Sequence, residues 1–340
     1  MPVNFWEKLK KRRRPILALA PLAGFTDSAF RQICKKYGAD VLYSEMASAA
    51  ALFYTLGRIN DKKTKGEKAE NKIFKNSTLK LLKFNRRSEK YYVVQLFGSE
   101  PKHFAVAAKI ITEKIKPDGI DINFGCPVPK VVKQGAGCGL MKDLKRSRAV
   151  IEAVLENTGL PVSIKIRAQA GNISASQFFK NISDLPIAAV MIHGRTQAQG
   201  FAGVPDWHSI KSARQYFKGV ILANGGINDL AGAKKVLQAT GADGLGLARG
   251  VLGRPWLFKE IKTGEQINLK PKTIFKIAVN HATLAAKLKG KAGLIELRKH
   301  LVWYVAGLSG AAKIRERLVK VGNLKDVKNI LEKIGAGKIN

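Results

Sequence analysis

Short runs of apolar and β-branched residues alternate along most of the chain with stretches in which apolar positions recur at helical spacing. The strand-like runs are Ile16–Ala23, Val41–Met46, Tyr91–Phe97, Gly119–Phe124, Val162–Ile166, Ala188–His193, Val220–Ala223 and Gly244–Ala248. The helical stretches between them include Asp27–Tyr37, Pro101–Ile115, Leu144–Glu156, Ala175–Ile182, Trp207–Tyr216 and Leu230–Ala239. Eight strands alternating with helices are the number that closes a parallel α/β barrel, so the pattern predicts a (β/α)8 TIM barrel.

A doubly wound parallel sheet is the other architecture that such alternation produces. That fold carries a glycine fingerprint after its first strand, and the segment Ala20–Gly24 (APLAG) does not fit it. The stretch Arg58–Lys90 interrupts the alternation with 12 basic and four acidic residues. Ser77–Phe84 could be the helix before the third strand. The rest is either a solvated surface loop or a contact with RNA, and its composition leaves both open.

The strand pattern ends at about Pro271, and amphipathic helices follow. Their predicted ranges are Ile274–Lys289, Leu294–Ala306, Ala311–Lys320 and Leu324–Ile334. We therefore predict a barrel over residues 1–260 and an all-helical domain over residues 261–340. The helical part carries 17 Lys and Arg against five Asp and Glu. This imbalance indicates a module that binds an anionic partner, with ordinary solvated helix faces as the alternative.

The charge of the whole chain points to the same kind of partner. Its 340 residues include 60 Lys and Arg against 25 Asp and Glu, a net charge of +35. Nucleic acid is the most frequent partner of so basic a surface, although a lysine-rich proteome would also produce it. The apolar runs are too short to span a membrane and the N-terminus does not resemble a secretory signal. We therefore expect a soluble, cytoplasmic protein.

Polar or glycine-rich residues follow the predicted strands at the ends where a barrel enzyme places its catalytic groups. They are Pro21, Leu22 and Ala23, then Glu45 and Met46, Gln95, Asn123–Cys126, Lys165 and Arg167, His193 and Arg195, Asn224, Gly225 and Gly226, and Ala248, Arg249 and Gly250. The last two strands of such barrels commonly hold a phosphate. Their glycines would let backbone N–H groups approach an oxyanion, and Arg249 would add a charged fork. Taken singly, each glycine pair is more often just a turn.

Lys165 and His193 are polar residues in two otherwise apolar predicted strands, near the end where the catalytic groups are expected. Alternation points Lys165 away from Ile164 and Ile166, and a buried ammonium needs an anion or an electron-rich partner. A reduced flavin would be one, while a strand end emerging into water is the alternative. His193 is interpreted as a phosphate or flavin contact rather than a proton donor.

Cys126 lies in a Gly-Cys-Pro turn after the fourth strand. The flanking Gly125 and Pro127 would fix its thiol on a loop that faces the barrel mouth. Thiols ordinarily titrate at about pH 8.5, so a free cysteine can act as a general acid. Cys34 reads as a core residue, and Cys138 stands among glycines. Three cysteines without paired spacing predict neither a disulfide framework nor a metal site.

These motifs resemble the tRNA-dihydrouridine synthase family. The matching segments are Ala20–Asp27 (APLAGFTD), Gln95–Gly98 (QLFG), Asp121–Pro127 (DINFGCP), Lys165–Arg167 (KIR), His193–Thr196 (HGRT), Asn224–Gly226 (NGG), Arg254–Trp256 (RPW), Leu297–Tyr304 (LRKHLVWY) and Gly310–Ala312 (GAA). The resemblance covers residues 15 to 320. It implies an FMN barrel, a helical domain that docks tRNA, and NADPH or NADH as the electron donor.

The resemblance also implies roles for particular residues. Cys126 would give a proton to C5 of a uridine, Asn123 and Arg167 would position that base, and Arg298 and Lys299 would help to dock tRNA. FMN would be held by Pro21, Leu22, Ala23, Gln95, Lys165, His193, Asn224, Gly225, Gly226, Ala248 and Arg249. The chain departs from the family where Leu22 replaces a more usual Met, where Ala248 replaces a more usual Gly, and in the length of the lysine-rich segment.

Two other functions fit parts of the same pattern. An FMN barrel that acts on a free pyrimidine such as dihydroorotate shares the phosphate-binding strands, but it needs no basic helical domain. A non-catalytic RNA-binding protein on a relic barrel would keep the charge and lack the flavin. The identity of the uridine that would be reduced does not follow from the sequence.

Overall fold

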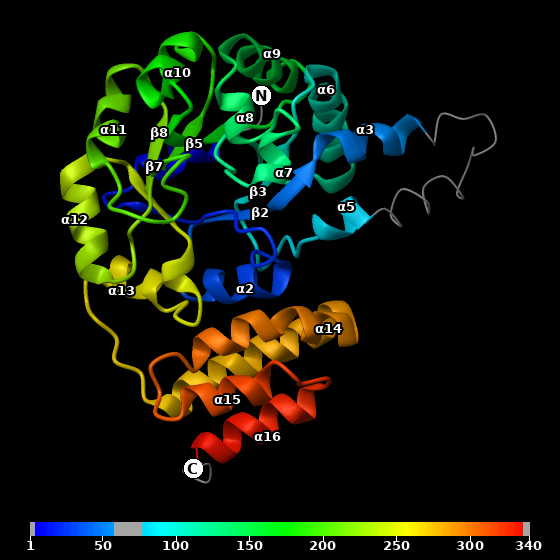
Figure 1. The fold of residues 1–340 in the computed structure, drawn as a ribbon, viewed down its shortest axis with the longest axis vertical. Helices are drawn as coiled ribbons and strands as arrows, with labels where there is room; N and C mark the ends of the chain where they lie inside the picture. The colour runs from blue at the N-terminus through cyan, green and yellow to red at the C-terminus, as the bar shows by residue number, and fades with distance from the viewer. Residues whose placement is uncertain (1–3, 58–76, 336–340) are drawn as a thin grey trace.

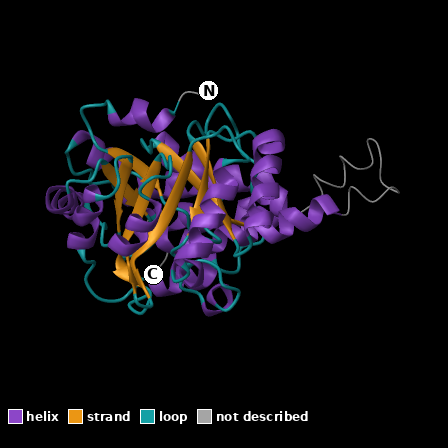
Figure 2. Ribbon diagram, turned by 90° about the horizontal axis from the view of Figure 1, so that it is seen from above, coloured by secondary structure: helices purple, strands orange, loops and turns teal. Residues whose placement is uncertain are grey.

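The computed structural model describes residues 4–57 and 77–335, and it confirms the predicted barrel. The parallel strands are β1 (Ile16–Leu19), β2 (Val41–Ser48), β3 (Tyr92–Phe97), β4 (Gly119–Asn123), β5 (Val162–Ala170), β7 (Ala189–Thr196), β8 (Val220–Asn224) and β9 (Gly244–Leu247). Each strand pairs with the next, and β9 pairs back with β1, which closes the ring seen in Figure 2. A short β6 (Ile173–Ser174) is antiparallel to the end of β5.

Helices surround this ring (Figure 2). They are α2 (Ser28–Lys36), α3 (Ala49–Gly57), α5 (Ser77–Leu81), α6 (Pro101–Ile110), α7 (Pro129–Val132), α8 (Cys138–Met141), α9 (Leu144–Leu155), α10 (Ala175–Ile182), α11 (Trp207–Ser212), α12 (Leu230–Thr240) and α13 (Leu257–Thr263). The predicted Ala175–Ile182 matches α10, and the longer predicted Pro101–Ile115 continues beyond α6 as a π-helix over Ile111–Ile115. The predicted first strand is too long, because β1 ends at Leu19 and Pro21–Ala23 lie in the following loop.

Local side chains explain where several of these helices begin. Asp27, Asp143 and Asp229 each accept a hydrogen bond from a backbone N–H in the first turn of α2, α9 and α12. Ser174 forms a reciprocal capping box with Gln177 at the start of α10. Such caps satisfy N–H groups that have no partner inside the helix, so they fix the boundaries between βα loops and helices.

The amino end of the barrel is closed by an N-terminal helix, α1 (Phe5–Lys10). Its Phe5, Trp6 and Leu9 are buried in one cluster with inward-facing strand residues that include Met191 and Leu222. The hydrophobic pattern of the sequence did not predict this helix, because only three of its side chains, Phe5, Trp6 and Leu9, form its buried face. Because α1 covers the amino ends of the strands, a binding site in the barrel has to lie at their carboxyl ends.

The C-terminal helices form a second layer beneath the barrel (Figure 1). They are α14 (Pro271–Tyr304), α15 (Ala311–Leu318) and α16 (Leu324–Gly335). Gly290 has φ 58° and ψ −140° inside α14, so this element is two helices joined at a kink, as the two predicted ranges indicated. Ile261 on α13 packs into the barrel core, so α13 crosses the predicted domain boundary and belongs with the barrel by its contacts.

Helix α2 joins the two layers. Ala29 and Ile33 on one face of α2 are buried in the same apolar cluster as Leu297 and Leu301 of α14. Lys289 of α14 forms an ion pair with the capping Asp27 at 3.2 Å. None of the helices among the described residues is both long and apolar enough to cross a membrane.

Candidate functional site

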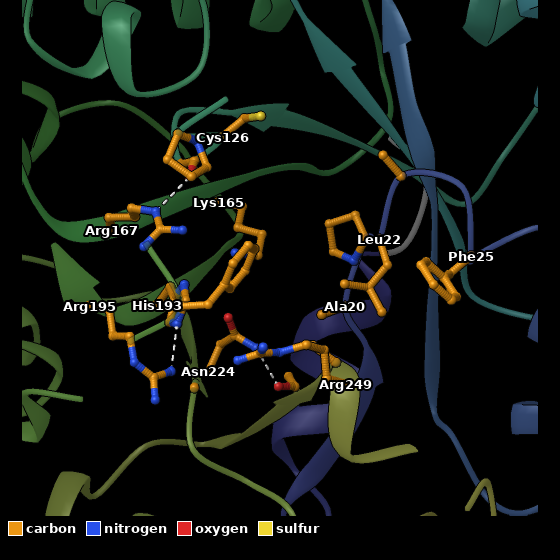
Figure 3. A pocket seen from close by; sticks show the side chains of 18 of the residues that line it. Ala20, Leu22, Phe25, Cys126, Lys165, Arg167, His193, Arg195, Asn224 and Arg249 are labelled. Atoms are coloured by element: carbon orange, nitrogen blue, oxygen red, sulfur yellow. Dashed lines mark hydrogen bonds between the residues drawn. The ribbon is translucent and has the colours of Figure 1, made fainter. Parts of the chain in front are cut away.

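A cavity of about 420 Å³ opens at the carboxyl ends of the barrel strands. The residues predicted to hold the cofactor all line it, and so do Cys126, Asn123 and Arg167 (Figure 3). The predicted cofactor residues are Pro21, Leu22, Ala23, Gln95, Lys165, His193, Asn224, Gly225, Gly226, Ala248 and Arg249. The fold therefore brings these positions together, while the roles given to them stay predictions.

Lys165 reaches into the cavity from β5 (Figure 3). It makes no hydrogen bond or ion pair with any residue in the described ranges. Burial, and then repulsion from Arg167, lower the pKa of its ammonium from 10.5 to about 8, although the Asp121 carboxylate opposes this. A partly desolvated cation without a partner favours an anionic ligand at this point.

His193 is neutral in this site. Burial, followed by repulsion from Lys165 and Arg167, lowers the pKa of the imidazole to about 2. Arg195 Nη1 lies 3.3 Å from His193 Nε2 and donates to it, so Nδ1 carries the proton of the neutral ring. A neutral imidazole can accept or donate a hydrogen bond but adds no charge, and the contact role given to His193 stays a prediction.

The ends of β8 and β9 form the glycine-rich part of the cavity. Gly225 has φ +107° and Gly226 has φ +73°, conformations that L side chains rarely adopt, and a Cβ on Gly225 would lie 2.7 Å from the His193 ring. Asn224 Nδ2 donates to the Gly246 carbonyl at 2.7 Å and ties the two strands together. Ala248, where the family more often has Gly, has φ −122° and ψ −108°.

A buried network holds Cys126 at the other end of the view in Figure 3. Asn123 Oδ1 accepts hydrogen bonds from the backbone N–H groups of Gly125 (3.1 Å) and Cys126 (2.9 Å). Gln95 accepts from Asn123 Nδ2 (2.9 Å) and donates to Asp121 (2.7 Å). Burial raises the pKa of the Asp121 carboxyl to about 6, against the hydrogen bonds from Gln95 and Ser163 that lower it. Gln95 and Asn123 thus position the cysteine loop as well as lining the cavity.

Arg167 is 2% exposed and connects the loop after β4 with the end of β7 and the loop that follows it. Its Nε donates to the Gly125 carbonyl at 2.8 Å, and its Nη1 donates to the carbonyls of Thr196 (3.0 Å) and Gly200 (2.8 Å). These bonds occupy much of the guanidinium. A contact with a substrate base would therefore use the donors that remain.

Arg298 and Lys299 lie outside the lining of the cavity. Arg298 donates to the carbonyls of Val321 (2.7 Å) and Lys320 (3.3 Å), so it fastens α14 to the segment between α15 and α16. The ammonium of Lys299 lies 5.5 Å from the centre of the Phe25 ring, at the loop after β1. Of the two predicted docking residues, Lys299 is the one beside the cavity, because Phe25 lines it.

Two aromatic residues at the cavity were missed by the sequence reasoning. Phe201, in the loop after β7, is 58% exposed, and the guanidinium of Arg249 lies 4.7 Å from its ring centre. Trp303 of α14 is 41% exposed and also lines the cavity. Large exposed aromatics in a loop or on a helix carry no periodic signal, and only their residue type could have drawn attention to them.

Comparison with known proteins gives one consistent family. The model of the dihydrouridine synthase (Dus) family matches residues 18–336. A probable tRNA-dihydrouridine synthase 1 from Synechocystis sp. is 32% identical over 325 residues, which are 92% of this chain and 84% of that protein. A probable tRNA-dihydrouridine synthase from Rickettsia conorii is 33% identical over 307 residues, 88% of this chain and 87% of that one.

Among solved structures, histamine dehydrogenase from Rhizobium sp. 4-9 is similar over 83% of this chain, with a TM-score of 0.51 and 11% identity. This chain spans 51% of the length of that protein. At so low an identity the likeness supports the barrel fold and nothing about the reaction.

Proposed function

This chain belongs to the dihydrouridine synthase family, and from that premise we propose that it reduces the C5–C6 double bond of particular uridines in tRNA to 5,6-dihydrouridine. We further propose that it uses bound FMN, with NADPH or NADH as the electron donor. One observation carries the proposal: a single cavity is lined by Lys165, which has no ion-pair or hydrogen-bond partner among the described residues, by the glycine pair Gly225 and Gly226, and by the free thiol of Cys126.

The residues of the cavity fit FMN. The Lys165 ammonium lacks an anionic partner within the described ranges, and an electron-rich isoalloxazine would provide one. The positive φ angles of Gly225 and Gly226 leave their backbone open to a phosphate, and Arg249 would contribute a charged donor there. Neutral His193 and Asn224 would complete the polar contacts, while Pro21, Leu22 and Ala23 would give the apolar wall.

When bound, FMN would supply hydride-transfer chemistry toward C6 of the uridine, with NADPH or NADH as the source of electrons. The proton for C5 comes from the chain, and we assign it to the Sγ–H of Cys126. Asn123 holds this thiol in place through the backbone N–H groups of Gly125 and Cys126. Lys165 stabilises negative charge that develops at the cofactor end of the cavity.

The proposed substrate explains the charge of the helical domain. A uridine in folded RNA must leave its stack to enter a cavity, and enzymes that modify bases generally extrude them. Contacts with phosphates would supply much of the affinity, which is the purpose of 17 basic residues over residues 261–340. Lys299 beside Phe25 lies where bound RNA would meet the mouth of the cavity.

The direct test incubates the purified, FMN-loaded protein with unmodified tRNA and NADPH, followed by mass spectrometry of the nucleosides. A mass gain of two hydrogens on uridine is expected. Free uridine and orotate serve as parallel substrates, and Cys126→Ala serves as the inactive control. Reduction of a free pyrimidine without any change in tRNA would reject the proposal. A protein that does not bind flavin would reject it as well.

A further inference from the structure

A second cavity, of about 410 Å³, adjoins the first, and we propose that it binds a nucleotide during the reaction. The inference rests on the proposed function, which supplies two sources of such a nucleotide. One is the residue of the RNA that flanks the reduced uridine. The other is the adenosine half of the NADPH donor. Both present a phosphate next to a ring or amide that carries N–H groups.

The second cavity is continuous with the catalytic loop. Pro127, which directly follows Cys126, lines both cavities. Arg167 joins their walls, since it donates to the carbonyl of Gly125 on one side and to that of Thr196 on the other. A ligand that enters the first cavity with a nucleotide attached therefore has an adjoining place for that nucleotide, at the ends of β5 and β7.

Lys142 gives this cavity a cation. Its ammonium forms no ion pair or hydrogen bond with any residue in the described ranges. The stem of Lys142 packs over the turn at Gly171, where φ is +54° and a Cβ would lie 3.2 Å from the lysine Cδ and Cε. The turn thus leaves room for the lysine stem at the rim. An unpaired ammonium at the rim of a polar cavity suits a phosphate group.

Gln197 gives the cavity an unused amide. Its Oε1 is buried without a hydrogen-bond partner in the described part of the chain, and no hydrogen bond is made by its Nε2. A buried amide without partners costs free energy, which a polar ligand would recover. The terminal torsion of glutamine is broad and roughly two-fold, so rotation about it can turn either end of the amide toward the cavity. A nucleobase or a carboxamide offers the N–H groups that Oε1 lacks.

The test separates the two half-reactions of the FMN-loaded enzyme. Flavin reduction by NADPH and flavin reoxidation by tRNA are each followed anaerobically by stopped-flow absorbance, over a range of ligand concentrations. The variants are Lys142→Met and Gln197→Met. Lys145→Met, an exposed lysine of α9 outside the lining of both cavities, is the matched control for loss of one positive charge.

We expect Lys142→Met to raise the apparent Kd of at least one ligand on the order of tenfold, as loss of a charge-assisted hydrogen bond does. Gln197→Met should weaken the same ligand, while Lys145→Met changes neither Kd by more than about twofold. An effect on tRNA alone identifies the flanking nucleotide, and an effect on NADPH alone identifies the donor. Effects no larger than those of Lys145→Met in both half-reactions overturn the site.

Failure of the proposed function stays distinguishable from failure of this site. If tRNA does not reoxidise the wild-type flavin, the proposed function is wrong, and the NADPH arm still reports on the cavity. Bound flavin measured by absorbance shows whether each variant is folded and loaded.

Discussion

Replacing Lys165 with methionine should stabilise the flavin-free protein at neutral pH while weakening its hold on FMN. The ammonium is enclosed by the cavity, and burial, with repulsion from Arg167, lowers its pKa from 10.5 to about 8. The unfolded chain keeps the ordinary lysine pKa, so folding disfavours the protonated form. At every pH at which Lys165 is protonated, it therefore lowers the free energy of unfolding of the flavin-free protein.

The size of this effect follows from the two pKa values. Each pKa unit corresponds to about 1.4 kcal/mol, so the shift from 10.5 to about 8 corresponds to about 3 kcal/mol. The penalty is fully present below pH 8 and disappears as the pH rises from 8 to 10.5. Asp121 keeps its hydrogen bonds to Gln95 and Ser163 in the variant but loses a nearby cation. The value of about 3 kcal/mol is therefore an upper bound.

Urea denaturation followed by circular dichroism measures this difference directly. At pH 7, flavin-free Lys165→Met should exceed the wild type in free energy of unfolding by up to about 3 kcal/mol, and the two should approach each other near pH 10. Added FMN should reverse the order, because a ligand that binds the wild type more tightly stabilises it more. Lys145→Met controls for a change in net charge. A variant no more stable than the wild type at pH 7, or a difference unaffected by pH, would refute the reasoning.

Further changes separate chemistry, cofactor binding and domain structure. Cys126→Ala should leave flavin binding and its reduction by NADPH intact but abolish dihydrouridine in a tRNA assay; unchanged turnover would exclude Cys126 as the proton donor. Gly225→Ala should lower FMN affinity and cost about 1–3 kcal/mol of stability, because its φ of +107° strains a side chain that also meets His193; normal flavin content and unfolding midpoint would contradict this. Arg298→Met should destabilise the helical domain by about 1–3 kcal/mol, since it removes charged donors to backbone carbonyls. Lys299→Met should instead leave the unfolding midpoint unchanged and weaken tRNA in a binding titration; equal tRNA affinity would count against its docking role.

The sequence was sufficient for the barrel and the cavity because both follow from one rule. Parallel strands in a closed barrel all end at the same face, so residues that follow different strands converge there. Lys165 and Asn224 are far apart in the chain, yet both line the cavity, because Asn224 ends β8 and Lys165 lies on β5 beside Asn123, the last residue of β4. Errors of a few residues in the strand boundaries, as at Pro21–Ala23, did not matter since loop and strand end lie at the same edge.

What the sequence could not supply were contacts between elements distant in the chain. From the sequence, Arg298 is interpreted as a basic residue of a binding surface. In the structure its guanidinium donates hydrogen bonds to the carbonyl of Val321, more than twenty positions later in the chain. Trp303 reads as part of an amphipathic helix, and it reaches the cavity only because α14 packs against α2 and the loop after β1. Neither arrangement leaves a periodic or compositional trace, since the first depends on packing within the helical domain and the second on how that domain is docked on the barrel.

The placement of Cys126 shows how the fold and the proposed chemistry depend on each other. The thiol is fixed by Asn123, whose oxygen is fully engaged with the N–H groups of Gly125 and Cys126. One N–H of the Asn123 amide donates to Gln95. The other N–H of that amide faces the Met46 sulfur, which lies 3.8 Å from Asn123 Nδ2. Asn123 can therefore offer a base only that weakly used N–H, which selects a carbonyl oxygen and not another donor. A pyrimidine carbonyl held there would lie against the loop that carries Cys126, the proposed proton donor, so binding of the base and delivery of the proton would rely on one buried network.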